Sequence, residues 1–335
     1  MREVAIGPND AGQRLDRFLR KLLPSATLGH VFKLLRKGNV KLNGRKSKPD
    51  VRLTEGDKVT LFLSPERMGD LATGRARQAA PRNRSRKALT FLYRDDHVLA
   101  VDKPPFLVVQ PGGDPTEATL EDLVRESIGP VEGLTFRPSL AHRLDRGTSG
   151  VILMGISAPG LRGLTQAFRE QTVTKTYLAL VEGVPREPQF TVDAPLLRAS
   201  AGEGQAARVR VSHHPDALAA RTEVSLLAAS PDGRYSLVQA RPKSGRTHQI
   251  RVHLRSKNLP IVGDGAYGRP QVNRLVKDGA GLWRTFLHAA RIQLRHPVEP
   301  EQRLDVRSPL PDDLLRALKW AKVPRAAVSS SEGDS

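Results

Sequence analysis

The stretch AHRLDRGTSGVILM, residues 141–154, joins a short polar loop to a run of apolar residues. Glycines and small hydroxyl residues follow Asp145, and the apolar run begins at 151, so the pattern predicts a tight loop that leads into a strand. Asp145 lies between Arg143 and Arg146, whose positive charges favour the ionised carboxylate. Such a carboxylate at the floor of a cleft can act as a nucleophile or a general base, but an aspartate in this setting can also simply cap a turn.

From residue 89 to about 323 the chain alternates between strand-like runs and helical segments. The β-branched and apolar runs lie at 90–100, 151–155, 176–181, 222–227 and 236–240. A helical segment is expected around 161–170. This alternation predicts one α+β domain over residues 89–323.

Residues 12–63 are predicted to form a small separate unit. Apolar residues with helical spacing predict one helix over 15–22 and a second over 31–35. An alternating run that ends in Asn43-Gly44 indicates a tight turn, and residues 59–63 alternate as a strand.

Two segments have no hydrophobic periodicity. Residues 64–88 are rich in Gly, Pro, Ala, Ser and Arg and are predicted to form a basic linker. Its charged side chains either contact phosphates or belong to a flexible spacer with no fixed contacts; they include Arg82, Arg84, Arg86 and Lys87. The last residues, 324–335, are expected to form a disordered tail.

The chain has a formal net charge of +19, and the excess lies mainly near the N-terminus. Residues 1–88 contain 21 Lys and Arg against 8 Asp and Glu, a net of +13, and the remaining residues contribute +6. This asymmetry predicts a polyanionic partner, and favours nucleic acid over a merely solvated surface. Basic residues crowd around the second predicted helix and the turn after it, which favours a surface that follows phosphates. They include Lys33, Arg36, Lys37 and Arg45.

The composition also excludes several classes of protein. The sequence has no cysteine, so disulfides and thiolate metal sites are excluded, and a cytoplasmic location is expected. The N-terminus lacks the apolar run of a signal peptide, and no stretch is apolar for long enough to span a membrane. The histidines lack the spacing and carboxylate partners of a metal centre, so no metal is expected. Nothing in the sequence requires more than a monomer.

Four segments resemble, in order, the signatures of the RluA-type pseudouridine synthases. They are HRLDRGTSG at 142–150, KTYLALVEG at 175–183, GRTHQIRVHL at 245–254, and LHA at 287–289 with HP at 296–297. The N-terminal runs RLDRFLRKLL (14–23) and RKGNVKLNGR (36–45) resemble the S4 RNA-binding domain. The S4 resemblance departs from its usual pattern at 28–30, where Leu-Gly-His replaces a Ser-Arg pair. The combination most resembles the RluC-type branch, which acts on large-subunit ribosomal RNA.

The resemblance implies a pseudouridine synthase domain with a mixed or antiparallel sheet and no cofactor. Asp145 matches the family's catalytic aspartate. Tyr177 matches the tyrosine that stacks on the target base and can handle a proton, and Arg251 matches the arginine that pairs with the carboxylate. The reaction breaks the N1–C1′ bond of uridine, rotates the uracil and forms a C5–C1′ bond. The carboxylate can attack the sugar or deprotonate it to a glycal, and the sequence leaves both routes open.

A target uridine has to leave its stack to enter a cleft, so its flanking phosphates need partners. The candidates are His142, Arg143, Arg146 and Arg246. For His142 and Arg143 the alternative is a structural role in shaping the aspartate loop.

Some positions depart from the family pattern. In the loop after residue 102, Phe106 replaces the usual glycine and Gln110 the usual histidine. Gly147 stands where the family often has aspartate, and the segment 155–160 also differs. The changes at Phe106 and Gln110 either alter substrate preference or are neutral.

The expected partner is large-subunit ribosomal RNA or one of its assembly intermediates. Two alternatives remain open: a non-catalytic RNA-binding factor for ribosome assembly on the same scaffold, and the same chemistry on transfer RNA. The enzyme is favoured because all three matched active-site residues are present.

Overall fold

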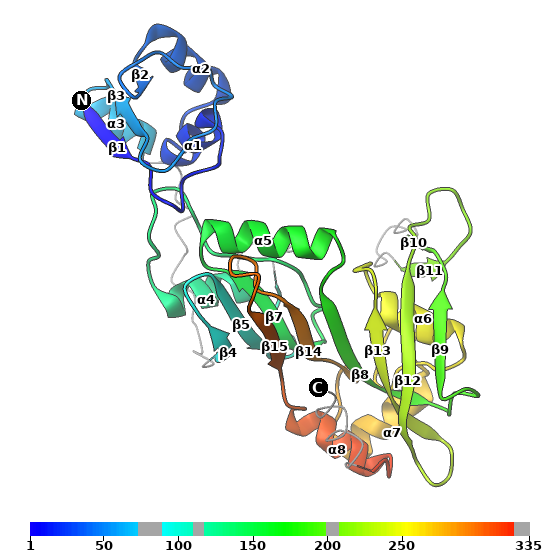
Figure 1. The fold of residues 1–335 in the computed structure, drawn as a ribbon. Coiled ribbons are helices and arrows are strands. Elements are labelled where there is room, and N and C mark those ends of the chain that lie inside the picture. Colours follow the sequence, from blue (N-terminus) through cyan, green and yellow to red (C-terminus); the bar gives the residue numbers. More distant parts are fainter. Residues whose placement is uncertain (73–88, 110–116, 199–207, 325–335) are drawn as a thin grey trace.

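The computed structural model describes residues 1–72, 89–109, 117–198 and 208–324. The side chains of Arg82, Arg84, Arg86, Lys87 and Gln110, and residues 325–335 of the expected tail, lie outside these ranges. Figure 1 shows two bodies, which we call the N-terminal lobe (residues 1–72) and the main lobe (the described residues from 89 onward). Among the described residues, no helix is long and apolar enough to cross a membrane.

The N-terminal lobe packs its helices against a three-stranded antiparallel sheet with the order β1-β3-β2. Its elements are β1 (Arg2–Ala5), α1 (Leu15–Leu22), α2 (Leu28–Lys37), β2 (Val40–Leu42), β3 (Lys58–Leu61) and α3 (Pro65–Ala72). Leu15, Phe18 and Leu19 are fully buried, which explains why the helical spacing predicted α1. The expected turn is also present, because Asn43 and Gly44 both have positive φ, 50° and 77°.

Two elements of the N-terminal lobe were not expected from the sequence. β1 pairs with β3, and its Val4 is part of the lobe's core. α3 occupies the start of the segment predicted to be a linker, and none of its residues is buried. The domain boundaries at 12–63, 64–88 and 89–323 stay a prediction.

The main lobe is built on a ten-stranded mixed sheet, which agrees with the expected fold class. Its strands are β4 (Thr90–Arg94), β5 (Val98–Lys103), β6 (Ser139–Leu140), β7 (Ser149–Gly155), β8 (Thr174–Glu182), β9 (Gln189–Asp193), β12 (Arg221–Ala229), β13 (Tyr235–Pro242), β14 (Leu287–Arg295) and β15 (Arg303–Arg307). The order is β4-β5-β7-β14-β8-β13-β12-β9, with β6 on β7 and β15 on β14. A second sheet pairs β10 (Leu196–Arg198) with β11 (Val209–Val211), and the helices are α4 (Leu120–Ile128), α5 (Ala158–Arg169), α6 (Gln249–Ser256), α7 (Pro270–Ala280) and α8 (Asp312–Trp320).

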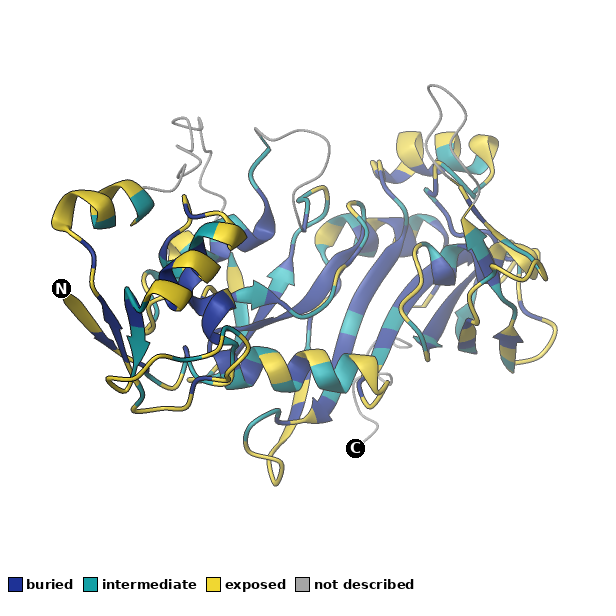
Figure 2. Ribbon diagram, turned by 90° about the horizontal axis from the view of Figure 1, so that it is seen from above, coloured by how far each residue is buried: buried dark blue, intermediate teal, exposed yellow. Residues whose placement is uncertain are grey.

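The strand after the Asp145 loop, β7, is buried along its whole length (Figure 2). Its residues alternate between two cores: Ile152 and Met154 pack on one face of the sheet, and Val151 and Leu153 on the other. This two-sided burial is why the sequence shows a continuous apolar run rather than an alternating one. β7 pairs in parallel with β14 at Gly150, where an added Cβ would lie 2.2 Å from the carbonyl oxygen of Ala289. Only glycine permits this close approach. Gly150, the last residue of the Thr148-Ser149-Gly150 sequence, therefore lets the Asp145 loop lead directly into the centre of the sheet.

α5 packs across β7 through Gly155, where a Cβ would lie 2.4 Å from the Cα of Leu161. Ser157 caps the helix by accepting a hydrogen bond from the N–H of Gly160. The departure from the family pattern at 155–160 therefore has a packing role.

The expected strand run over 90–100 is instead the hairpin of β4 and β5. The Asp95 carboxylate accepts the backbone N–H groups of His97 and Val98 at 2.6 and 2.7 Å and so fixes the turn.

Residues 9–13 attach the N-terminal lobe to the main lobe. The Asp10 carboxylate is buried and accepts three hydrogen bonds, from the N–H groups of Leu134 and Thr135 and from the Thr135 hydroxyl, at 2.6, 2.9 and 2.6 Å. Asn9 Oδ1 accepts the N–H of Ala158 at the start of α5. These bonds fix the position of the basic lobe relative to the sheet.

Asp10→Ala is expected to destabilise the protein by about 1–3 kcal/mol, because the two backbone donors lose a buried acceptor. Thermal unfolding measures the effect. Glu55→Ala, which removes an exposed carboxylate from the same lobe, serves as the control. Equal melting temperatures for Asp10→Ala and wild type would show that Asp10 does not hold the lobes together.

Candidate active site

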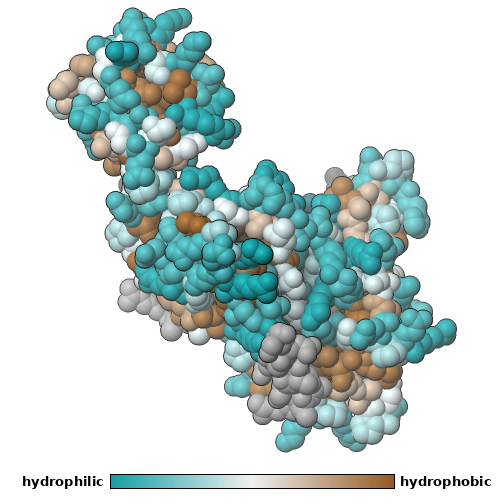
Figure 3. Space-filling model, in the orientation of Figure 1, coloured by the Kyte–Doolittle hydropathy of each residue, from teal (hydrophilic) through white to brown (hydrophobic). Residues whose placement is uncertain are grey.

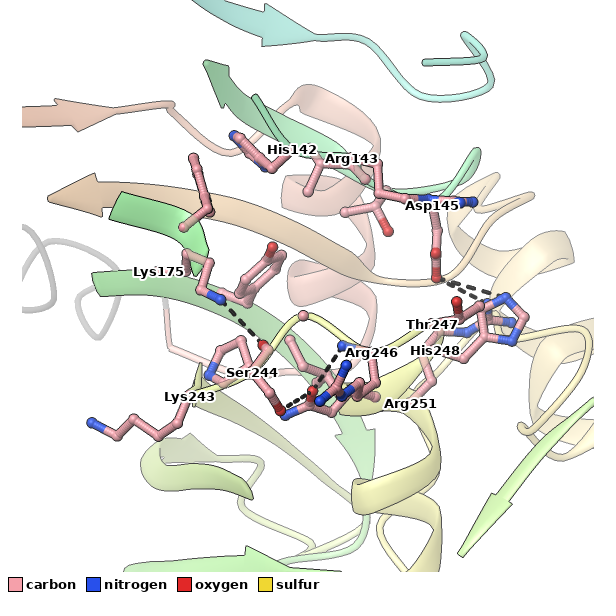
Figure 4. A pocket seen from close by; sticks show the side chains of 18 of the residues that line it. His142, Arg143, Asp145, Lys175, Lys243, Ser244, Arg246, Thr247, His248 and Arg251 are labelled. Carbon is pink, nitrogen blue, oxygen red and sulfur yellow. Dashed lines mark hydrogen bonds and ion pairs between the residues drawn. The ribbon is translucent and has the colours of Figure 1, made fainter. Parts of the chain in front are cut away.

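A pocket of about 480 Å³ opens in the main lobe between the Asp145 loop and the N-terminus of α6. Its walls come from the loop before β7, from β8, and from the segment that joins β13 to α6 (Figure 4). The lining includes His142, Arg143, Asp145, Lys175, Tyr177, Arg246, His248 and Arg251. The pocket therefore brings together segments that lie more than 100 residues apart in the chain, as the four sequence motifs predicted.

The Asp145 loop is fixed by bonds to its backbone carbonyls. Lys103 is fully buried, and its Nζ donates to the carbonyls of Pro104, Leu107 and Arg146 at 2.9, 3.1 and 3.3 Å. Burial lowers the pKa of Lys103 to about 7, whereas the three carbonyl acceptors favour its ammonium form. On the other side, Arg284 Nη1 donates to the Gly147 carbonyl at 3.2 Å. The loop thus presents Asp145 in a fixed position with its side chain 25% exposed.

Arg251, on α6, bridges two carboxylates. Its Nη1 donates to Asp145 Oδ2 at 3.1 Å, while its Nε and Nη2 bond both oxygens of Asp264 at 2.6 and 2.8 Å. Burial alone raises the pKa of Asp264, but the bonds from Arg251 and from two backbone N–H groups outweigh it, and the pKa is lowered overall. Asp264 therefore stays ionised and holds the guanidinium in the orientation that meets Asp145.

His248 also approaches the Asp145 carboxylate, with Nε2 3.9 Å from Oδ2 (Figure 4). Its backbone is in the left-handed region, with φ 55°, and its Nδ1 bonds the hydroxyl of Tyr267 at 2.9 Å. Burial lowers the pKa of His248 despite the attraction of Asp145. The neutral ring leaves Arg251 as the cation that contacts Asp145.

Tyr177 lines the same pocket from β8. Burial, reinforced by the negative charge of Asp145, raises the pKa of its hydroxyl. The hydroxyl therefore remains protonated at neutral pH and can donate a hydrogen bond. Lys175, two residues earlier, also lines the pocket; burial lowers its pKa to about 8, and its Nζ donates to the Ser244 carbonyl at 3.1 Å.

The four candidate phosphate ligands of the main lobe differ in their surroundings. His142 accepts the N–H of Leu153 at 2.9 Å and stacks on Phe168, and burial lowers its pKa to about 3. A neutral ring bonded in this way favours the structural alternative for His142. Arg143 and Arg246 are exposed at the pocket. Arg146 is exposed but pairs with Glu117 at 2.8 Å and lies outside the lining.

The basic candidates of the N-terminal lobe are all exposed. Lys33, Arg36 and Lys37 lie on α2, and Arg45 follows the turn after β2. Figure 3 shows largely hydrophilic side chains over the visible face of this lobe. The charge predicted from the sequence is thus available to a polyanion.

Asp264, Tyr267 and Lys103 were not identified as site residues from the sequence. Asp264 is followed by glycine within GDGAYG, a pattern that predicts only a turn. Lys103 comes directly after residue 102, where the sequence predicts a loop, and its sequence neighbours do not distinguish it from an ordinary loop lysine. Their roles depend on contacts that form only in the folded chain. Asp264 bonds Arg251, 13 residues away in sequence, and Lys103 bonds Arg146, 43 residues away.

Comparison with known proteins agrees with this geometry. Residues 97–256 match the RNA pseudouridylate synthase family, and residues 13–59 match the S4 domain. The chain is 37% identical over 329 residues to the ribosomal large subunit pseudouridine synthase C of Escherichia coli O157:H7, covering 94% of this chain and 95% of the relative. The protein of the same name from Vibrio vulnificus is 33% identical, with 96% and 97% covered. The chain belongs to the RNA pseudouridylate synthase family.

Solved structures give the same result for the main fold. Human RNA pseudouridylate synthase domain containing 4 aligns with a TM-score of 0.55 and 25% identity, over 70% of this chain and 93% of the other. Human RNA pseudouridylate synthase domain containing 1 aligns with a TM-score of 0.54 and 26% identity, over 67% and 84%. The protein is thus an RNA pseudouridine synthase with an N-terminal S4 domain.

Asp264→Asn is expected to lower turnover about 10- to 100-fold, because Arg251 loses its fixed orientation and no longer aligns Asp145. Single-turnover rates at saturating RNA measure the loss, and filter binding checks that RNA affinity is retained. Asp305→Asn is the matched control, since Asp305 forms an equivalent two-oxygen pair with Arg291 outside the pocket. Equal losses in both variants would mean that Asp264 contributes only stability.

Proposed function

We propose that this enzyme isomerises specific uridines of large-subunit ribosomal RNA to pseudouridine, with Asp145 as the reacting carboxylate. The observation that carries the proposal is a single partly exposed carboxylate in the pocket lining, bonded to Arg251, with Tyr177 in the same lining. The names of the full-length relatives support the choice of ribosomal RNA.

The reaction moves a base within one nucleotide, so it is redox-neutral and loses no atoms. The N1–C1′ bond breaks, the uracil turns, and C5 bonds to C1′. C5 then releases its proton and N1 takes one up, so product and substrate are isomers. Asp145 either attacks the sugar or removes a sugar proton to give a glycal, and both routes begin from an ionised carboxylate. Arg251 supports that state by charge and by its hydrogen bond.

The target base has to be flipped out of the RNA, which costs a few kcal/mol of unstacking. Stacking on Tyr177 recovers about 1–3 kcal/mol of that cost. Arg143 and Arg246, both exposed at the pocket, are positioned to meet the flanking phosphates. The exposed cations of the N-terminal lobe add contacts to more distant phosphates.

The proposal includes a single copy of the chain acting in the cytoplasm, on ribosomal RNA or on an intermediate of subunit assembly. Asp145, Tyr177 and Arg251 line one pocket within a single chain, so the site needs no residue from a second copy. The internal transfer needs no oxidant, reductant or group carrier, so no cofactor is proposed.

Asp145→Asn is expected to bind RNA like wild type and to form no product, because the neutral amide can neither attack nor deprotonate the sugar. Carbodiimide mapping of unmodified large-subunit rRNA and bulk tRNA transcripts measures this, with Asp305→Asn as the active control. The expected result is reverse-transcription stops, which mark pseudouridines, in rRNA treated with the wild-type enzyme and none in rRNA treated with Asp145→Asn. Stops only in tRNA would overturn the substrate, and activity in Asp145→Asn would overturn the assignment of Asp145. Tight binding without any stops would favour the non-catalytic assembly factor.

The double substitution Arg36→Ala with Lys37→Ala is expected to weaken RNA binding and to flatten its salt dependence. Each lost phosphate contact lowers the slope of log K against log salt by about 0.7–0.9. Filter binding at several salt concentrations measures the slope. Arg316→Ala with Lys319→Ala removes the same charge from α8, at the end of the molecule far from α2 (Figure 1), and is the control. Identical slopes for the two double variants would exclude a specific RNA contact at α2.

A further inference from the structure

Phe106 has a backbone conformation that is unusual for its residue type. Its φ is 67°, in the left-handed region where a Cβ is strained and glycine is favoured. The other described non-glycine residues with positive φ are all polar: Asn43, Gln171, His248, Asn258 and Lys322. A bulky apolar residue in this region points to a functional constraint when no structural one accounts for it.

The Phe106 side chain is not explained by core packing. It is 50% exposed, and it belongs to none of the buried apolar clusters of the described residues. Its neighbours Leu107 and Val109 do pack into the core. The chain thus bears backbone strain and an exposed aromatic ring at a position where glycine would remove both.

The position of Phe106 is fixed relative to Asp145. Its N–H donates to the Arg146 carbonyl at 2.7 Å, and its own carbonyl accepts from Arg146 Nε at 3.3 Å. Lys103 Nζ donates to the same Arg146 carbonyl. The backbone of Phe106 is therefore hydrogen-bonded to the residue directly after Asp145, whose loop lines the pocket.

The surroundings of Phe106 favour a nucleic acid over a protein. Arg143 and Arg146 are both exposed on the Asp145 loop, to which the Phe106 backbone is bonded. Arg146 pairs with Glu117. Protein interfaces bury a continuous apolar patch whose centre is depleted of charge. A single aromatic ring beside arginines is instead the arrangement that binds unpaired nucleotides, because every base offers a π-face.

We propose that Phe106 is a stacking platform for an unpaired base of the substrate RNA, next to the uridine that enters the pocket. The proposal rests on the proposed function and adds a contact to a neighbouring nucleotide. Phe106 acts in binding and takes no part in the bond-making steps.

The test is Phe106→Gly, which relieves the backbone strain and removes the ring. Its melting temperature is expected to equal or exceed that of wild type. The Kd and KM for RNA are expected to rise about 5- to 150-fold, the equivalent of about 1–3 kcal/mol for one stacked base, with kcat retained at saturation. Phe106→Tyr should bind like wild type, and Phe106→Leu should resemble the glycine variant. Asn258→Gly is the matched control, since it relaxes an exposed left-handed residue, with φ 59°, without removing a ring.

A second readout locates the contact. An RNA fragment carrying 2-aminopurine beside the mapped uridine should lose fluorescence on binding wild type and Phe106→Tyr, but not Phe106→Gly. Unchanged Kd and KM in Phe106→Gly, or equal increases in Phe106→Gly and Asn258→Gly, would overturn the stacking role. If wild type modifies no uridine, the proposed function fails, while filter binding of rRNA transcripts by the same variants still decides whether Phe106 contacts RNA.

Discussion

The active site depends on one guanidinium group that serves two carboxylates. Arg251 gives two of its donors to the buried Asp264 and one to Asp145. The Asp264 pair fixes the direction of the guanidinium, so that the remaining donor is directed at Asp145. A lone arginine beside Asp145 would supply the same charge but not the same geometry.

Under the proposed function, several separate surfaces around this site would contribute to extruding the target base from the RNA. Extruding a base costs a few kcal/mol, and no single contact recovers all of it. Under the proposed function, stacking on Tyr177, the arginines at the pocket and the cations of the N-terminal lobe would each supply a part. The buried Asp10 contact holds the N-terminal lobe in one position relative to the pocket. The favourable contacts of both surfaces would therefore be made together by only one geometry of the RNA.

The sequence predicted those elements of the fold whose local pattern is clear. Helical spacing identified α1, α2 and α5, and the apolar run after Asp145 identified β7 as a strand. The convergence of Asp145, Tyr177 and Arg251 on one pocket agrees with the motifs. Long-range contacts escaped prediction: nothing local distinguishes Asp264 from a turn aspartate, and His142 resembled a phosphate ligand because its bond to Leu153 forms only in the sheet. β1 was missed for the same reason, since it is a strand only through its pairing with β3.

The strand order has a consequence for how the enzyme matures. Asp145 precedes β7 and Tyr177 lies in β8, but these strands do not pair with each other, because β14 (Leu287–Arg295) lies between them. During synthesis both residues leave the ribosome well before the strand that spaces them. The nascent chain therefore carries all three matched residues for some time without an assembled pocket. Pairing across such long separations is slow to form, so the pocket assembles only after β14 has been synthesised.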